Sequence, residues 1–311
     1  MLGVVAALAV SETVLRACHF RFQAIPEVQF GWPEPSVIQH DFESDPEVLW
    51  VPRDYRARLA RAATAEILFL GDSCVAFSTY PAIVLGRLAT QGHAWSSEVL
   101  AVPGWSSEQG RAQMQRDVSR LHPRVVTVEF GWNDHWDALG PPDAETHSGW
   151  LIRWAADHVR VYQAYRKAVL GVQRMREPDG PRRVGLDRYP ENLRAIVDMG
   201  TRLGARVVLV TAPANHQPGA EPEYLRPRHL RHLERLVPLH RAYVSVTREV
   251  AATTGATVCD VADAFARMTP TIRRRLFRAD GIHFSAAGDR VVGELVARCI
   301  EPSLGPVSPA P

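Results

Sequence analysis

The chain has 311 residues, which is long enough for one large domain or two modest ones with a sizeable buried core. Hydrophobic residues make up 46% and charged residues 23%, so the composition excludes a disordered chain, a fibrous repeat and a polytopic membrane protein. The 36 basic and 34 acidic side chains leave a formal net charge of +2, which gives no reason to expect a nucleic-acid partner.

Residues 1–22 are mostly apolar, and Glu12 and Arg16 interrupt them after an uncharged run that ends at Ser11. A bilayer core needs about 20 apolar residues, so this run is too short to span it. It also lacks the basic start and the cleavage site of a secretory signal. Two interpretations remain: a short helix packed on the domain, or the end of a membrane anchor whose upstream part the sequence lacks. The second is favoured and predicts membrane association, in a membrane-anchored or extracytoplasmic protein rather than a cytoplasmic one.

Residues 23–64 are rich in proline and show no sustained periodicity, which predicts an extended lead-in wrapped on the domain. From Glu66 onwards, short apolar runs alternate with helical stretches, the first two helices falling near residues 80–91 and 107–121. Strands that are buried on both faces and separated by helices indicate a parallel sheet in a three-layer α/β domain. We expect this domain to span residues 65–301.

A helical insertion is expected at about residues 140–190, inside the α/β domain. Within it, residues 148–176 carry apolar or aromatic side chains at the spacing of one long amphipathic helix. Its arginines and one lysine fit a solvated basic face, as in a core-facing or lid helix, better than a membrane-surface helix. Residues 177–189 read as a mobile polar loop, and residues 302–311 form a proline-rich tail.

Small and polar residues follow successive predicted strands, at the sheet edge where open parallel sheets bind ligands. Ser73 follows the first strand, Gly104 the second and Asn133 the third, and a late loop adds Asp280 and His283. A serine at a strand-to-helix turn presents its hydroxyl, so Ser73 is the candidate nucleophile. His283 is the candidate base, with Asp280 fixing its tautomer. The backbone N–H groups of Ser73 and Gly104 and the amide of Asn133 are the candidate oxyanion donors.

Each of these signals is weak by itself, because a Gly-Asp-Ser triplet is a common capping turn and Asp-x-x-His occurs by chance. Their appearance in chain order after the appropriate strands is an improbable coincidence. Position 75 is valine, so the G-x-S-x-G elbow of the α/β-hydrolases is absent.

The ordered blocks around Ser73, Gly104, Asn133 and His283 resemble those of the SGNH hydrolases, the GDSL-type esterase and lipase superfamily. The segments LFLGDSCVAFS, VPGWSSEQG, VEFGWNDHW and DGIHFSAAGDRVVGELVA resemble a bacterial branch whose members often carry an N-terminal hydrophobic anchor. The resemblance covers roughly residues 65–300. It implies a flavodoxin-like three-layer α/β/α sandwich with about five parallel strands. It also implies ester hydrolysis through an acyl-serine without metal or cofactor, with Ser73, Asp280 and His283 as the triad.

Two positions depart from the superfamily pattern. Cys74 follows the nucleophile, where a packed thiol is expected rather than a redox group. Ala101-Val102-Pro103 stands before Gly104 in place of the usual asparagine, which leaves open how the Gly104 turn is braced.

Three other functions remain as alternatives: a non-catalytic glycan-binding or scaffold protein on the same fold, an O-acyltransferase using the same site, and a zinc enzyme. His229, His232 and His240 would serve the zinc enzyme, with His229 and His232 on one helix face, but no carboxylate pattern completes that site. Cys259 and Cys299 read as small buried thiols, although the even cysteine count permits disulfides.

The expected substrate is a small-molecule or glycan ester, with a short acetyl-like acyl group favoured. Five aromatic or histidine side chains lie in or beside the site loops and could stack on a sugar ring, although packing of the cleft walls explains them equally well. They are Trp105, Trp132, His135, Trp136 and His216.

Overall fold

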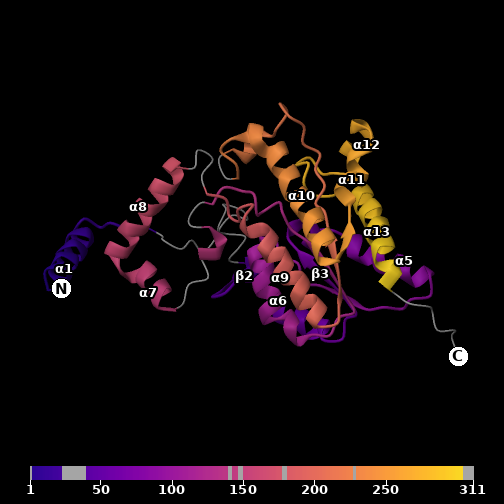
Figure 1. The fold of residues 1–311 in the computed structure, drawn as a ribbon, viewed down its shortest axis with the longest axis horizontal. Coiled ribbons are helices and arrows are strands. Elements are labelled where there is room, and N and C mark those ends of the chain that lie inside the picture. Colours follow the sequence, from indigo (N-terminus) through magenta and orange to yellow (C-terminus); the bar gives the residue numbers. More distant parts are fainter. Residues whose placement is uncertain are drawn as a thin grey trace.

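Five parallel strands form the central sheet, in the spatial order β4-β3-β5-β6-β7 (Figure 1). The computed structural model describes residues 2–22, 40–138, 142–145, 150–176, 181–226 and 229–303. The strands are β3 (Ile67–Gly71), β4 (Ser97–Val99), β5 (Val125–Glu129), β6 (Arg206–Val210) and β7 (Thr257–Cys259). Every residue of β3 and β5 is buried, as the continuous apolar runs require of strands covered on both faces.

The strand order places a topological switch between β3 and β5. The chain starts at β3, moves outward to β4 and then returns past β3 to β5, β6 and β7. In open α/β sheets, ligands bind at the carboxyl ends of the strands at such a switch. The strand order therefore predicts a ligand site at the loops after β3 and β5.

Helices cover both faces of the sheet. On one face α6 packs against α9, and α9 against α10, with α3 beside β4; on the other face α13 packs against α5 (Figure 1). The bounds on the first face are α3 (Tyr55–Ala62), α6 (Ser107–Arg116), α9 (Arg188–Arg202) and α10 (Leu236–Thr254). On the second they are α4 (Ser73–Ala76), α5 (Tyr80–Thr90), α11 (Val261–Ala266), α12 (Pro270–Arg275) and α13 (Ala286–Ile300). The prediction of a flavodoxin-like α/β/α sandwich is confirmed.

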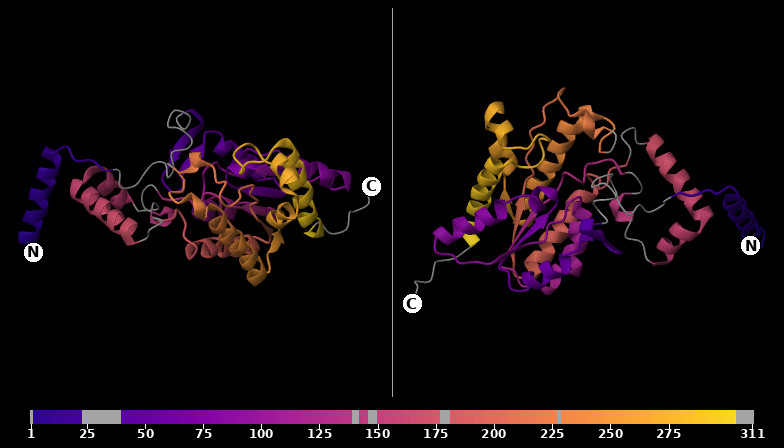
Figure 2. Two further views of the ribbon diagram at one scale, coloured as in Figure 1. Left: turned by 90° about the horizontal axis from the view of Figure 1, so that it is seen from above. Right: turned by 180° about the vertical axis from the view of Figure 1, so that it is seen from behind.

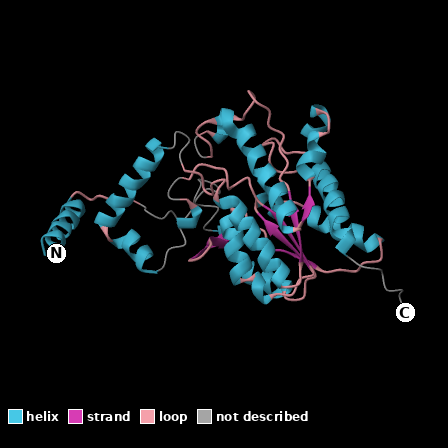
Figure 3. Ribbon diagram, in the orientation of Figure 1, coloured by secondary structure: helices cyan, strands magenta, loops and turns pink. Residues whose placement is uncertain are grey.

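The predicted lead-in at residues 23–64 contains regular structure. Residues 23–39 lie outside the described part, but β1 (Phe42–Asp45) and β2 (Leu49–Pro52) form an antiparallel hairpin beside the central sheet (Figure 3), and α3 follows it. The Asp45 carboxylate accepts the backbone N–H groups of residues 47 and 48 at 2.8 and 3.0 Å, which closes the turn. An extended lead-in was therefore wrong for residues 42–62.

The single long helix expected over residues 148–176 is two helices, α7 (Trp150–His158) and α8 (Arg160–Arg176). The chain bends at Val159, where the carboxylate of Glu12 accepts the first backbone N–H groups of α8, those of Arg160 and Val161, at 3.1 and 2.9 Å. Periodicity cannot detect this break, because the capping group comes from a distant segment.

Glu12 belongs to α1 (Leu2–Ala17), which docks on α7 and α8 away from the sandwich (Figures 1 and 2). Arg16 of α1 donates to the carbonyl of His158 at 2.6 Å, and Gln163 accepts the backbone N–H of Phe22 at 3.1 Å. Among the described residues, no helix combines the length and apolar character needed to cross a bilayer.

Cys259 and Cys299 form a disulfide, which corrects the expectation of two buried thiols. Cys259 ends β7 and Cys299 lies in the last turn of α13, and their Cα atoms are 5.7 Å apart. Residues 40 positions apart meet because α13 packs across β7. Cys18 and Cys74 are free.

Candidate active site

Ser73 is the first residue of α4, directly after β3. The Asp72 side chain caps this helix by accepting the backbone N–H of Cys74 at 2.8 Å. Gly71 permits the sharp turn, because a Cβ at this position would lie 2.5 Å from Val75 Cγ2 and 2.7 Å from the carbonyl oxygen of Glu129. The local sequence thus forces the Ser73 hydroxyl out at the end of the strand.

The side chains of Ser73, His283 and Asp280 form a continuous hydrogen-bonded row. His283 Nε2 lies 2.9 Å from Ser73 Oγ, and His283 Nδ1 lies 2.7 Å from Asp280 Oδ2. The other oxygen of Asp280 accepts the backbone N–H groups of Ile282 and His283 at 2.8 and 2.9 Å, which fixes the carboxylate on its own turn. Partial burial raises the pKa of Asp280, but these hydrogen bonds outweigh it and lower the pKa below its ordinary value. Asp280 is therefore ionised at neutral pH.

Gly104 adopts a left-handed turn with φ of 81° after β4, a conformation that favours glycine. Arg183 braces this turn by donating from Nη1 to the Gly104 carbonyl oxygen at 2.8 Å. Arg183 is fully buried and forms an ion pair with buried Asp143 at 2.7 Å, and Asp143 also accepts from Ser106 Oγ at 2.7 Å. Arg183 and Asp143 thus stabilise the Gly104 turn, which lacks the asparagine that usually precedes this glycine.

The burial of Arg183 contradicts the expectation of a mobile polar loop at residues 177–189. Residues 177–180 lie outside the described part, but Arg183 and Val184 are buried and α9 already begins at Arg188. No sequence pattern marks Arg183 for this position, since its partners lie 40 and 79 residues away.

Asn133 follows β5 and brings its side-chain amide to the same place. Its Nδ2 lies 3.1 Å from Asp72 Oδ2 and 3.0 Å from the carbonyl oxygen of Trp105. The next residue, Asp134, accepts the backbone N–H groups of Ser107 and Gly131 at 2.9 and 3.0 Å. Asp72 and Asp134 therefore hold the site loops together, and Asn133 must loosen one of its two bonds to donate to a third acceptor.

A cavity of about 550 Å³ opens over these residues. Ser73, Gly104, Asn133, Asp280 and His283 line one part of it, and mostly apolar and aromatic side chains line the rest. The second group comprises Phe77, Trp132, Trp136, Tyr224, Leu225, His229, Arg278 and Ile282. Phe77 and Tyr224 are exposed, and the Tyr224 hydroxyl donates to the Asp280 carbonyl oxygen at 3.2 Å. Sequence reasoning missed Phe77, Tyr224 and Arg278, because no local pattern marks them as neighbours of the site.

The model of the GDSL-like lipase/acylhydrolase family matches residues 69–291, most of the chain and all the site residues just described. The chain belongs to this family. It is therefore an ester hydrolase, and the resemblance inferred from the sequence is confirmed.

Solved structures show the same fold. The lipase/acylhydrolase from Enterococcus faecalis is 22% identical with a TM-score of 0.52, over 78% of this chain and 98% of that one. A GDSL-like lipase from Bacteroides thetaiotaomicron is 14% identical with a TM-score of 0.51, over 81% and 97%. An acetyl xylan esterase is 15% identical with a TM-score of 0.50, over 75% and 98%. No curated protein sequence matches the chain significantly.

In this GDSL-like hydrolase, the five predicted substrate-contacting side chains separate into three groups. Trp132 and Trp136 line the cavity over Ser73. Trp105 and His135 do not: both are fully buried, Trp105 donating from Nε1 to the Trp50 carbonyl oxygen at 3.0 Å. His216 lines a neighbouring cavity instead, with its Nε2 2.8 Å from the Asp280 carbonyl oxygen. An aromatic side chain next to a site loop can point into the core as easily as into the cavity. The sequence position therefore did not decide which of the five side chains line the cavity over Ser73.

The alternative zinc site does not assemble. His229 and His232 both lie outside any α-helix, and the described residues contain no group of three or more metal-ligating side chains. His240 stacks on Trp132 at 3.9 Å, and its Nδ1 lies 3.2 Å from His135 Nε2. Burial lowers the pKa of His240 to about 4 and that of His135 well below its ordinary value, so both rings are neutral packing groups.

Cys74, the residue after Ser73, is buried. Burial raises the pKa of its thiol, and the nearby carboxyl of Asp72 raises it further. The thiol therefore stays protonated, as expected of a packed group rather than a redox group.

Proposed function

We propose that the chain hydrolyses O-acyl esters through an acyl-serine intermediate on Ser73. The observation that carries this proposal is the row in which His283 Nε2 lies 2.9 Å from Ser73 Oγ and His283 Nδ1 lies 2.7 Å from ionised Asp280. A nucleophile, a base and a group that orients the base are the three parts that serine acyl transfer requires.

In the first half of the reaction, Ser73 Oγ forms a bond to the acyl carbon while its proton moves to His283 Nε2. The carbonyl oxygen becomes an oxyanion, and its candidate donors are the backbone N–H groups of Ser73 and Gly104 and the amide of Asn133. The C–O bond to the alcohol then breaks, and His283 returns the proton to the leaving alcohol. In the second half, His283 Nε2 takes a proton from a water molecule as the water oxygen bonds to the acyl carbon. The bond between the acyl carbon and Ser73 Oγ then breaks, His283 returns the proton to Ser73 Oγ, and the acid is released.

We propose a short acyl group, acetyl or slightly longer, attached to a sugar or similar alcohol. Trp132 and Trp136 supply an apolar wall for the acyl group next to Gly104 and Asn133. Phe77 and Tyr224 are 40% and 51% exposed at the cavity, where aromatic faces can stack on a sugar ring. One protein of the same fold is an acetyl xylan esterase, which agrees with an acetyl group on a sugar. The similarity to that protein extends to the fold alone.

The test uses the purified chain and a panel of esters from acetyl to long-chain acyl, on p-nitrophenol and on acetylated xylo-oligosaccharides. We expect Ser73→Ala to lower kcat/KM at least about a thousandfold and to abolish labelling by a fluorophosphonate. Ser119→Ala, which removes an exposed hydroxyl on the surface, is the control and should keep both. A fluorophosphonate that labels another residue, or a fully active Ser73→Ala variant, would contradict the assignment.

Two other functions give different results in the same assay. An O-acyltransferase would transfer the acetyl group to an added sugar acceptor faster than to water. A non-catalytic glycan-binding protein would bind the oligosaccharide without turnover and without fluorophosphonate labelling.

We also propose that α1, α7 and α8 bind the surface of an anionic membrane. Of the sixteen large apolar side chains that are exposed in the described part of the chain, eleven lie on these three helices, Trp154 and Tyr165 among them. The two charged residues of α1, Glu12 and Arg16, bond to α7 and α8, so apolar side chains dominate its exposed surface. The sequence of α8 contains five basic residues and no acidic one, which favours anionic lipid over a second copy of the chain. The disulfide agrees with an oxidising compartment.

Flotation with phosphatidylglycerol-containing and pure phosphatidylcholine vesicles tests this proposal. We expect binding to the anionic vesicles only, and we expect Leu151→Ser/Trp154→Ser to weaken it severalfold. Ile272→Ser, which changes an equally exposed apolar residue on α12, is the control and should bind like the parent. Self-association in solution without vesicle binding would instead assign the surface to a second copy.

A further inference from the structure

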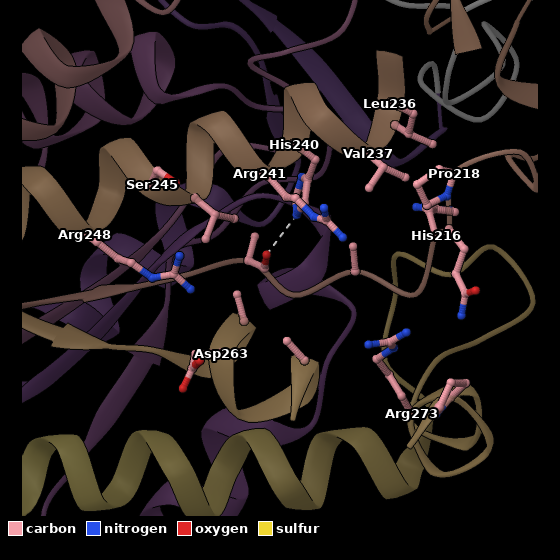
Figure 4. Close-up of a pocket in the computed structure, with 17 residues that line it drawn as sticks. His216, Pro218, Leu236, Val237, His240, Arg241, Ser245, Arg248, Asp263 and Arg273 are labelled. Carbon is pink, nitrogen blue, oxygen red and sulfur yellow. Dashed lines mark hydrogen bonds between the residues drawn. The ribbon is translucent and has the colours of Figure 1, made fainter. Parts of the chain in front are cut away.

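A second cavity of about 640 Å³ lies beside the active site. It is bounded by α10, α11, α12 and the segment that follows β6 (Figure 4). Leu236 and Val237 form part of an apolar wall, and Gln217 and Ser245 add polar groups. Nothing in the ester hydrolysis described above uses this space.

The charges around this cavity do not cancel. Four charged side chains line it: Arg241, Arg248, Arg273 and Asp263. Arg248 is paired with Asp260 at 2.7 Å, and Asp263 is paired with Arg267 at 2.7 Å. Arg241 and Arg273 have no carboxylate partner in the described part of the chain. Since burial lowers the pKa of the two histidines that line the cavity, His216 and His240, the excess positive charge comes from these two arginines.

The two arginines come from different elements and face the same space. Arg241 lies on α10 and Arg273 on α12, and their guanidinium groups extend toward the middle of the cavity from opposite sides (Figure 4). Asn215 holds Arg273 in place by accepting from its Nε at 3.4 Å. No hydrogen bond to a described residue involves the terminal nitrogens of Arg273 or the guanidinium of Arg241. Two guanidinium groups with unused donors, next to an apolar wall, match an oxyanion attached to an organic body.

We propose that this cavity binds a small organic anion, with its carboxylate or phosphate group on Arg241 and Arg273 and its less polar part against Leu236 and Val237. The anion has two possible sources. It is either an acidic group carried by the ester substrate itself, as in an acylated sugar acid, or a free metabolite that regulates the enzyme.

His216 connects this cavity to the active site. The ring of His216 lines the second cavity, its Nε2 lies 2.8 Å from the Asp280 carbonyl oxygen, and it packs edge-on against Trp132 at 5.6 Å between ring centroids. Asp280 and Trp132 both line the cavity over Ser73. One side chain therefore lines the second cavity and contacts two residues that line the first, so an occupant of the second cavity lies close enough to influence the first.

Binding is measured on the full chain carrying Ser73→Ala, so that turnover plays no part. The probes are inorganic phosphate and D-glucuronate, with uncharged D-glucose as the reference. Their binding is measured by titration calorimetry and by the shift in melting temperature. We expect saturable binding of at least one anion and none of glucose. Arg241→Gln/Arg273→Gln should weaken it at least tenfold, because both charge-assisted donors are lost. Arg274→Gln removes the same charge from a neighbouring position of α12 outside the cavity and should leave binding unchanged.

The proposal is overturned if neither anion binds saturably, or if Arg274→Gln weakens binding as much as the double variant does. Because these measurements need no catalysis, they stand even if the proposed esterase reaction fails its own test.

Kinetics of the otherwise parental enzyme then distinguish the two sources. If the substrate carries the anion, the double variant raises the KM for acetylated glucuronate severalfold relative to its KM for acetylated glucose. If a free anion regulates the enzyme, added phosphate or glucuronate changes the rate on acetylated glucose, and the double variant loses this response.

Discussion

Asn133 holds both acceptors of its amide at hydrogen-bond distance, Asp72 on one side and the Trp105 carbonyl on the other. To stabilise an oxyanion, the amide must exchange one of these bonds for the new one as negative charge develops. Asn133→Ala should therefore lower kcat roughly a hundredfold with little change in KM, because the bond to the oxyanion forms only in the transition state. Steady-state kinetics on p-nitrophenyl acetate measure both constants. An altered KM with normal kcat would make Asn133 a substrate contact instead.

Arg183 donates to the Gly104 carbonyl but does not line the cavity over Ser73, so we propose it as a positioning residue. Lysine keeps the charge next to Asp143 but cannot reproduce the planar set of donors that also reaches the Gly104 carbonyl. Arg183→Lys should lower kcat about tenfold while KM stays near that of the parent. Arg182→Lys, the same exchange one residue earlier, affects a pair with Asp137 and is the control. Loss of stability without any loss of kcat in the folded variant would show that Arg183 has a purely structural role.

Glu129 ends β5 in the core, where burial raises the pKa of its carboxyl from 4.5 to about 8 and buried Asp72 adds to this effect. The folded state then binds more protons than the unfolded state between these two pH values, so stability falls as pH rises through the window. Glu129→Gln removes this titration and should raise the melting temperature at pH 8.5 by several degrees, with little change at pH 5. Thermal unfolding of both proteins at the two pH values gives the difference. A difference that is equal at pH 5 and pH 8.5 would contradict a buried, protonated Glu129.

At the scale of elements, the disulfide joins residues 40 positions apart, and the segment between them contains α11, α12, most of α13 and the proposed triad residues Asp280 and His283. It restricts the unfolded chain and ties the end of α13 to β7. We expect Cys299→Ser to lower the free energy of unfolding by about 2–4 kcal/mol in denaturant titrations.

Cys18→Ser changes an exposed free thiol and is the control for the disulfide variant. Dithiothreitol should destabilise the parent and Cys18→Ser alike, and should leave Cys299→Ser unchanged. Identical unfolding of the parent with and without the reductant would show that the bond is absent in solution.

At the scale of the whole molecule, α1, α7 and α8 stand apart from the sandwich that carries the site (Figure 2). The proposed triad and oxyanion donors all belong to the sandwich and its loops. Deleting residues 1–20 should therefore keep kcat/KM for a small soluble ester within about twofold of the parent. Removal of Glu12 exposes the first N–H groups of α8, so hydrogen exchange over residues 150–176 should become faster. If the deletion instead unfolds the sandwich, α1 is part of the domain rather than an accessory to it.

The sequence by itself determined the parallel sheet, the positions of the strand-end loops and the family. The buried runs Ile67–Leu70 and Val125–Val128 are continuous in the chain. A strand that is buried on both faces needs apolar side chains at consecutive positions, so the sequence shows it directly. Ser73, Asn133 and His283 could also be predicted, because each belongs to a short motif that is visible in the sequence. The predicted strand order then places these motifs at the same edge of the sheet.

Only the tertiary structure decided which side chains meet across the molecule. It placed Arg183 on Gly104, joined Cys259 to Cys299, buried Trp105 and His135, divided the long helix at Val159 and opened the cavity between Arg241 and Arg273. The physical reason is that periodicity records which face of an element is buried, whereas the partner on the opposite side comes from another part of the chain. Contacts between residues far apart in sequence leave no local pattern, so they become visible only once the chain is folded.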